Sequence, residues 1–159
     1  MVHLEILRDT REQKGWGFDA LNATISDETI STGDYTLPSF CNYDEENDTY
    51  NPNYAIERKG GEDFIDSIFQ RRDRFQSEVQ RADDWQFPLL VLVEEPRRTF
   101  RRNRKFMQYR DATWPKIRNT TDAWQQNMNV EFQFVGSREK AQQVAFEKLA
   151  TTLRLNLLG

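Results

Sequence analysis

The side chains in this sequence that could do chemistry are carboxylates and one lysine, placed where predicted strands end. Asp34 lies on one predicted strand, and Glu57 and Lys59 lie on the next strand along the chain. Because side chains alternate along a strand, Glu57 and Lys59 share one face and Arg58 takes the other. In a hairpin Asp34 can sit across from Glu57, within reach of a shared ion.

Three more acids could converge at the same edge of the sheet. Asp9 ends the first predicted strand, Glu12 lies in the turn after it, and Asp63 opens a helix, whose positive dipole end favours a carboxylate. Each acid also has a plainer interpretation. Asp9 and Glu12 could belong to a turn with an internal Arg11 ion pair, and Asp63 could be only a helix-start residue. The remaining set could be a charged, solvated hairpin end.

The chemistry of such a set follows from its charge. Carboxylates held close together repel unless one is protonated or a cation intervenes. Oxygen ligands in this number suit Mg²⁺ or Mn²⁺. Such an ion polarises a phosphoryl oxygen and lowers the pKa of bound water, and a nearby lysine can orient that water or stabilise charge on a phosphate. The acidic set therefore fits metal-assisted phosphodiester hydrolysis.

Composition removes several other classes. The 159 residues suit one domain, and the single cysteine, Cys41, excludes an intramolecular disulfide. With only one histidine, His3, a zinc site of four Cys and His ligands is excluded as well. No apolar run reaches the length of a membrane span and no signal peptide opens the chain. We therefore expect an intracellular protein without membrane contact, in the cytoplasm or nucleoid, or in a host cell if viral.

The elements that must position these side chains form an α/β pattern with a mixed central sheet flanked by helices. Residues 10–29 read as irregular and 39–52 as a long hairpin connection with an acidic tip. Hydrophobic periodicity predicts strands at 2–8, 29–37, 53–59, 88–94 and 130–135, and helices at 62–83, 116–127 and 138–153. The crossover helix 62–83 should make strand 88–94 parallel to strand 53–59, so both strands end at one edge.

A basic segment follows strand 88–94 and should emerge at that edge. Its cations are Arg97, Arg98, Arg101, Arg102, Arg104 and Lys105. They could be a solvated loop or the start of a helix. Alternatively they could bind DNA phosphates, with Phe100, Phe106 and Tyr109 as stacking partners for bases.

The ordered motifs resemble a known family. They are Asp9-Thr-Arg-Glu12, Gly33-Asp34-Tyr35, and Ile56-Glu57-Arg58-Lys59 with Asp63 four places on. The set resembles the nuclease domain of the XPF/Hef-type family, with its restriction-endonuclease-like fold, and is most similar to free-standing bacterial, archaeal and phage members. The resemblance is clear over about residues 5–95 and continues beyond by element order.

The resemblance implies a role for each matching residue. Asp34 and Glu57 would be metal ligands for Mg²⁺ or Mn²⁺, joined by the backbone carbonyl of Arg58 and by Asp9. Lys59 would be the catalytic lysine, with Glu12 completing the acidic site and Asp63 supporting it. Arg11 and Arg58 would pair with the acids or bind DNA phosphate.

The function implied is a metal-dependent DNA endonuclease acting on branched, flap or partly single-stranded DNA, in repair, recombination or replication. Residues 1–159 would form one nuclease domain without a helix-hairpin-helix module. The partners implied are DNA, a second copy of the chain, and a protein that supplies substrate specificity. Two alternatives stay open: a duplex-cutting restriction-like or phage host-takeover nuclease, and a non-catalytic DNA-binding or inhibitory protein that retains the fold.

Overall fold

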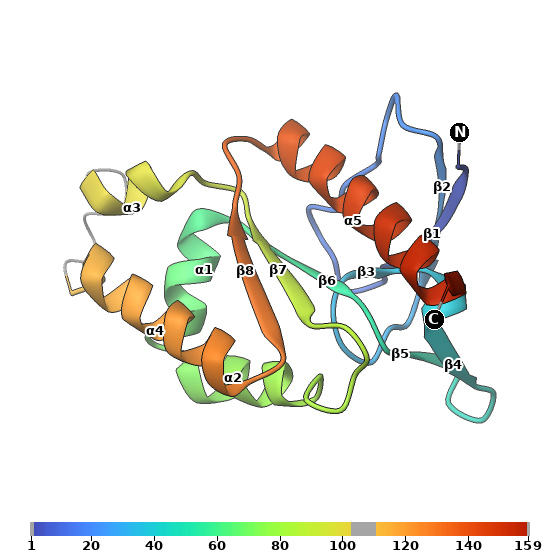
Figure 1. Ribbon diagram of the computed structural model, residues 1–159, viewed down its shortest axis with the longest axis horizontal. Helices are drawn as coiled ribbons and strands as arrows, with labels where there is room; N and C mark the ends of the chain where they lie inside the picture. Colours follow the sequence, from blue (N-terminus) through green and yellow to red (C-terminus); the bar gives the residue numbers. More distant parts are fainter. Residues whose placement is uncertain (1, 103–110, 159) are drawn as a thin grey trace.

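A six-stranded sheet forms the centre of the molecule, with strand order β2-β1-β3-β6-β7-β8. The structure is a computed structural model that describes residues 2–102 and 111–158 (Figure 1). The sheet strands are β1 (Leu4–Asp9), β2 (Ala23–Glu28), β3 (Tyr35–Thr36), β6 (Ile56–Lys59), β7 (Leu89–Val93) and β8 (Val130–Phe134). A separate hairpin pairs β4 (Cys41–Asp44) with β5 (Thr49–Pro52), after the short 3-10 helix η1 (Pro38–Phe40). The helices are α1 (Gly61–Ile68), α2 (Arg72–Gln80), α3 (Arg97–Arg102), α4 (Trp114–Asn127) and α5 (Arg138–Leu158).

Strand direction decides where the candidate residues meet. β1 runs parallel to β2, and β6, β7 and β8 run parallel to one another. β3 alone runs the other way, since it pairs antiparallel with both β1 and β6. The carboxyl ends of β1, β6 and β7 therefore lie at one edge, and β3 begins there. The predicted parallel pairing of strands 53–59 and 88–94 is confirmed by the β6–β7 ladder.

Two hydrophobic clusters fill the two faces of this sheet. β7 is buried along its whole length, and its side chains alternate between the clusters. Val91 packs with Phe64 of α1, Phe75 of α2 and Trp124 of α4 on one face. On the other face, Leu92 packs with the stripe that α5 presents at helical spacing, Ala141, Ala145 and Leu149. Figure 1 shows α5 crossing the sheet apart from α1, α2 and α4.

The fold class is as predicted, but four segments differ from the sequence-based expectation. The connection expected at 39–52 forms η1 and the β4–β5 hairpin. Residues 10–29, expected to be irregular, contain the edge strand β2, whose apolar contacts are limited to Ala23 and Ile25. The strand expected at 29–37 is only the two-residue β3. The helix expected at 62–83 is two helices, because the N–H of Arg71 bonds the carbonyl of Asp66 and then a new helix begins.

The described helices also bear on membrane contact. Within residues 2–102 and 111–158, none of them combines the length and apolar character that a membrane crossing requires.

Candidate active site at the carboxyl edge of the sheet

Asp34 is fixed by a turn that only glycine allows. Gly33 has a φ of +89°, and a Cβ there would lie 2.6 Å from the Cβ of Ala55. This close approach lets the N–H of Asp34 donate to the carbonyl of Ile56 at 2.8 Å. The Asp34 carboxylate in turn accepts the N–H of Arg58 at 2.7 Å. The carboxylate is thereby held against the end of β6.

Asp34 and Glu57 form a pair of carboxyl groups whose charged forms destabilise the folded state. Burial, and then the neighbouring Glu57, raise the pKa of Asp34 well above its ordinary value. Burial also raises the pKa of Glu57, although Lys59 acts against that shift. The two groups are close enough to share a proton, and a divalent cation would relieve the repulsion between their charged forms.

Lys59 lies beside this pair on the same face of β6, as strand alternation predicts. Its Nζ is 3.5 Å from Glu57 Oε2 and 3.5 Å from Asp63 Oδ2. It also lies 4.7 Å from the ring centroid of Phe75. Burial alone would lower the pKa of Lys59, but Glu57 and Asp63 raise it above its ordinary value. Lys59 is therefore a cation that can donate hydrogen bonds to an anionic ligand.

Asp63 is held by a residue that sequence reasoning did not assign to the site. Arg71, at the break between α1 and α2, contacts Asp63 Oδ1 at 2.6 Å and Asp66 Oδ2 at 2.8 Å. The only sequence signal for Arg71 is its place between two helical periods. A cavity of about 60 Å³ lies next to it, lined by Lys59, Arg71, Arg74 and Glu78 among others.

Asp9 lies at the same edge but has other partners. Its Oδ2 accepts a hydrogen bond from Arg11 Nε at 2.6 Å, and its Oδ1 accepts the N–H of Ile30 at 3.1 Å. Arg11 also donates to the carbonyl of Ile30 at 2.9 Å. The internal ion pair foreseen as the plainer interpretation is therefore present. Asp9 fixes the chain that leads from β2 toward Asp34 and holds Arg11 next to the site.

Glu12 and Arg58 meet on the opposite face of β6. Arg58 forms a bidentate pair with Glu12, with Nε to Oε2 and Nη2 to Oε1 both at 3.0 Å. Its remaining guanidinium nitrogen Nη1 bonds Glu94, which also accepts Trp16 Nε1 at 3.1 Å. These bonds brace the main chain of β6 beside Asp34. Sequence reasoning missed Glu94, whose signal is that it is the first polar residue after the buried β7.

An open cavity of about 940 Å³ lies over this edge. Its lining is mostly charged: Arg11, Glu12, Lys14, Arg58, Glu62, Asp63, Asp66, Arg71, Arg74 and Glu95, with Gln13, Gly60 and Gly61. In residues 2–102 and 111–158, no group of three or more His, Cys, Asp or Glu side chains is placed to hold a metal ion. At this edge Asp34 and Glu57 are two carboxyl groups that interact with each other, and the carbonyl of Arg58 belongs to the residue directly after Glu57.

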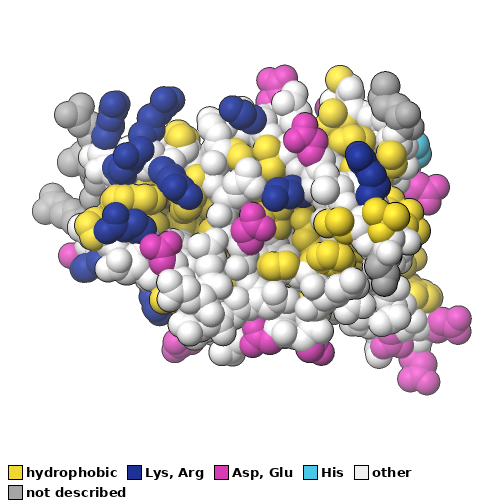
Figure 2. All heavy atoms as spheres, viewed as in Figure 1, with side chains coloured by type: hydrophobic (Ala, Val, Ile, Leu, Met, Phe, Trp, Pro, Cys, Tyr) yellow, Lys and Arg dark blue, Asp and Glu magenta, His cyan; other side chains and the backbone are white. Residues whose placement is uncertain are grey.

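The basic segment that follows β7 forms α3 at the same end of the molecule. Arg97, Arg98, Arg101 and Arg102 are all exposed there, as the dark blue group in Figure 2 shows. Arg97 lies 5.6 Å from the ring centroid of Phe134. Phe100 is buried and therefore belongs to the core, which corrects its interpretation as a stacking partner. Four residues of the segment named above, Arg104, Lys105, Phe106 and Tyr109, lie outside the described residues.

Comparison with known proteins gives a family match and a fold match. The ERCC4 domain model matches residues 8–146. The structure of XPF from Aeropyrum pernix is 17% identical, with a TM-score of 0.68 over 94% of this chain and 65% of that one. The complex of XPF from Aeropyrum pernix with DNA gives the same identity and TM-score, 17% and 0.68, over 96% of this chain and 66% of that one. No curated protein sequence matches. The chain thus spans just under two thirds of the length of these structures, which share its fold.

Proposed function

Because the chain belongs to the ERCC4 domain family, the XPF/Hef-type nuclease domains, we propose that it is a metal-dependent endonuclease that hydrolyses phosphodiester bonds in DNA. The observation that carries this proposal is the Asp34–Glu57 carboxyl pair with Lys59 beside it. Burial raises the pKa of both carboxyl groups, so their charged forms destabilise the ion-free fold and a cation there has a physical reason to bind.

The ligands proposed for Mg²⁺ or Mn²⁺ are the carboxylates of Asp34 and Glu57 and the carbonyl of Arg58. When bound, the ion would activate water and polarise the phosphate that is attacked. Asp9 would act less directly, because both its oxygens already hold Arg11 and the Ile30 N–H. We assign it the role of placing Arg11 beside the carboxylates.

The other residues of the site would bind and orient the substrate. Lys59, as a cation, would donate a hydrogen bond to a non-bridging phosphate oxygen and stabilise the charge that develops there. Arg11, Arg71 and Arg74 line the large cavity and would contact neighbouring phosphates. Glu12 and Glu94 would hold Arg58, and through it the main chain of β6, in place.

We propose branched, flap or partly single-stranded DNA as the substrate, in repair, recombination or replication. Arginines of α3 extend a cationic surface beyond the cavity at the same edge. The C-terminal turns of α5 expose Leu155, Leu157 and Leu158 at 53%, 77% and 86%, and we assign this apolar end to contact with a second copy or a partner protein.

The test is a cleavage panel with Glu57→Gln as the central variant. Labelled single-stranded, duplex, flap and forked DNA are incubated with Mg²⁺ or Mn²⁺. Loss of one ligand should lower the cleavage rate about a thousandfold, while DNA binding stays near its wild-type level. Glu147→Gln, an exposed change on α5, is the matched control.

Each outcome of the panel decides between functions. Wild-type cleavage by the Glu57→Gln protein would remove the catalytic assignment. Equal cleavage of plain duplex and branched DNA would favour a duplex-cutting nuclease, and no cleavage of any DNA with Mn²⁺ would favour a non-catalytic binding protein.

A further inference from the structure

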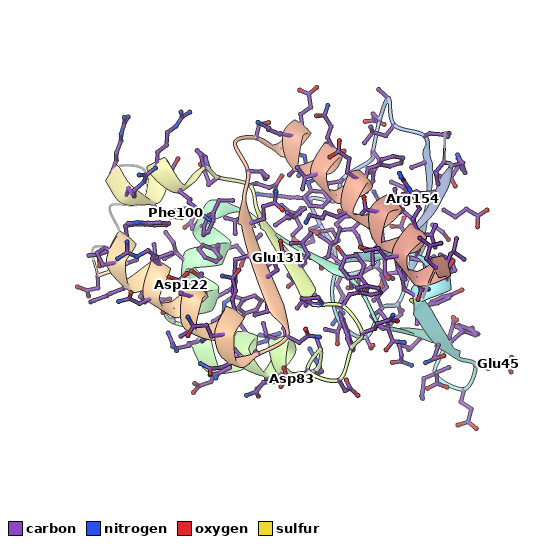
Figure 3. The ribbon with its side chains drawn as sticks, in the orientation of Figure 1. Glu45, Asp83, Phe100, Asp122, Glu131 and Arg154 are labelled. Atoms are coloured by element: carbon purple, nitrogen blue, oxygen red, sulfur yellow. The ribbon has the colours of Figure 1, made fainter. Side chains whose placement is uncertain are left out.

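A second cavity, of about 440 Å³, lies between the β4–β5 hairpin and the turn that follows α2. In Figure 3, Glu45 marks the tip of that hairpin and Asp83 marks that turn. The hairpin side contributes Asn42, Asn51 and Asn53, and the α2 side contributes Arg81 and Trp85. None of these residues belongs to the large cavity over the catalytic edge.

The polar side chains of this cavity are free to bind a ligand. Asn42 and Asn51 are cross-strand partners, so their amides project side by side. Across the described part of the chain, the side chains of these two residues and of Asn53 have no hydrogen-bond partner, and Arg81 has no carboxylate within ion-pair distance. By contrast, the side-chain Nδ2 of Asn129 donates hydrogen bonds to three main-chain carbonyls.

The cavity walls are tied to the segments that carry the catalytic carboxylates. Ser31 and Thr32 also line it, and Thr32 is two residues before Asp34, so their Cα atoms are at most about 7 Å apart. Asn53 is four residues before Glu57, at most about 14 Å away. The hairpin is fixed in place because the N–H of Ser31 donates to the carbonyl of Tyr50 at 3.0 Å. With a rise of 3.4 Å per nucleotide along each strand of a duplex, both wall residues are within about four nucleotides of the carboxyl pair.

The chemistry of this lining differs from that of the large cavity. The charges of Arg81 and Asp84 cancel, and the remaining groups are amides, hydroxyls, one indole and the ring of Pro52. Amides read the hydrogen-bonding edges of bases, an indole face stacks on a base, and a single guanidinium binds one phosphate. Stacking on an indole needs a base that has left the duplex stack, and the Watson–Crick edge of such a base is open to amides, so the ligand that fits is a nucleotide of a single strand.

We propose that this cavity, the amide pocket, binds an unpaired nucleotide of the DNA strand that crosses the Asp34–Glu57 pair. The inference rests on the proposed nuclease function and assigns recognition of the single-stranded part of the substrate to one pocket. It also assigns a function to the hairpin between Asp34 and Glu57, whose inner face supplies the asparagines.

The test uses the double variant Asn42→Ala/Asn51→Ala in the full chain, with Glu57→Gln in the background so that DNA stays intact. Binding is measured by fluorescence anisotropy on a blunt duplex and on the same duplex with a single-stranded tail. Loss of two hydrogen bonds should raise the Kd for tailed DNA about tenfold and leave the Kd for blunt duplex unchanged. Gln143→Ala, an exposed amide on α5 that does not line the pocket, is the matched control.

A second measurement covers the α2 side of the pocket. Arg81→Gln should weaken binding of the tailed DNA, and Arg154→Gln on α5 should not. In tailed DNA carrying 2-aminopurine at successive tail positions, fluorescence should be quenched at one or two positions in the parent protein. That quenching should be lost in the Asn42→Ala/Asn51→Ala protein.

Equal weakening on blunt and tailed DNA, or no weakening on either, would overturn the pocket assignment. Because binding is scored without cleavage, the two proposals can fail separately. Tail-dependent binding in a protein whose parent cleaves no DNA would contradict the nuclease and retain the pocket. Cleavage at the same rate with or without the asparagines, and with or without the tail, would contradict the pocket and retain the nuclease.

Discussion

At the scale of single residues, the candidate site holds two acidic side chains whose negative charges lower the stability of the fold. Two carboxyl groups are held together by a glycine turn and an N–H bond to Asp34, and burial raises the pKa of both. A structural role would favour an amide or an apolar residue at these positions. The arrangement is therefore expected where a ligand of opposite charge completes it.

Asp34→Asn should stabilise the ion-free protein. The folded-state pKa of Asp34 is above its value in the unfolded chain, so the folded state binds the extra proton and stability falls as pH rises through the folded pKa. Asparagine removes that charge and can still accept the Arg58 N–H. In EDTA at pH 7–8 the Tm should rise, by about 2–4 °C for each kcal/mol gained. The difference should shrink near pH 4, where the wild-type carboxyl is protonated.

The same melting experiment is repeated with the divalent ion added. Mg²⁺ or Mn²⁺ should raise the Tm of the wild type, because binding to the folded state alone stabilises it, and should do so less for Asp34→Asn. Asp122→Asn, an exposed change on α4, is the control for loss of a surface charge. An Asp34→Asn protein less stable than wild type throughout this pH range would show that the carboxylate is structural.

Sequence reasoning could group the acids but could not assign their partners. The spacing of Asp34, Glu57 and Lys59 along two neighbouring strands was enough to place them together, because alternation and pairing are local rules. Arg71 and Glu94 were not assigned to the site, because their roles depend on the geometry of a helix break and of a strand end. The hydrophobic pattern does not encode that geometry. Trp16 joins Glu94 across 78 positions of sequence, a contact that no local rule gives.

At the scale of elements, local sequence patterns predicted the elements that bury a full face and did not predict the strand at the edge of the sheet. β7 is an unbroken apolar run, so its central position was predictable. β2 has no fully buried side chain and is held mainly by main-chain pairing with β1, so its sequence is polar and resembles that of a turn. The break between α1 and α2 was equally hidden, because Ile65, Phe75 and Val79 keep nearly helical spacing across it.

Helix α3 should supply a sequence-independent part of DNA affinity. If Arg101 and Arg102 each neutralise one phosphate, Arg101→Gln/Arg102→Gln should flatten the slope of log K against log salt by about 1.4–1.8. The measurement is anisotropy of labelled DNA over a range of NaCl concentrations. Arg154→Gln on α5, over the opposite sheet face from α1 and α2, should change the slope little. Parallel lines for the double variant and the wild type would exclude α3 from the interface.

At the scale of the whole molecule, charge is unevenly divided although the net charge is only −4. The arginines of α3 lie at one end, and the hairpin with Asp44, Glu45, Glu46 and Asp48 projects at the other (Figure 2). An approaching polyanion is attracted to the first region and repelled by the second. The distribution should orient DNA before any contact forms.

Glu45→Gln/Glu46→Gln should therefore speed the association of DNA. These two side chains can be changed without loosening the hairpin, because its turn is held by Asp44 with Asn47 and by Asp48 with Tyr43. Removing two negative charges should raise the association rate constant about threefold at 20 mM salt, as measured by stopped-flow fluorescence. The effect should vanish by about 0.5 M salt, where the screening length is only a few ångströms. Glu5→Gln/Glu147→Gln alters the net charge equally at exposed sites outside the hairpin, so an equal acceleration there would mean that total charge, and not the hairpin, controls the encounter.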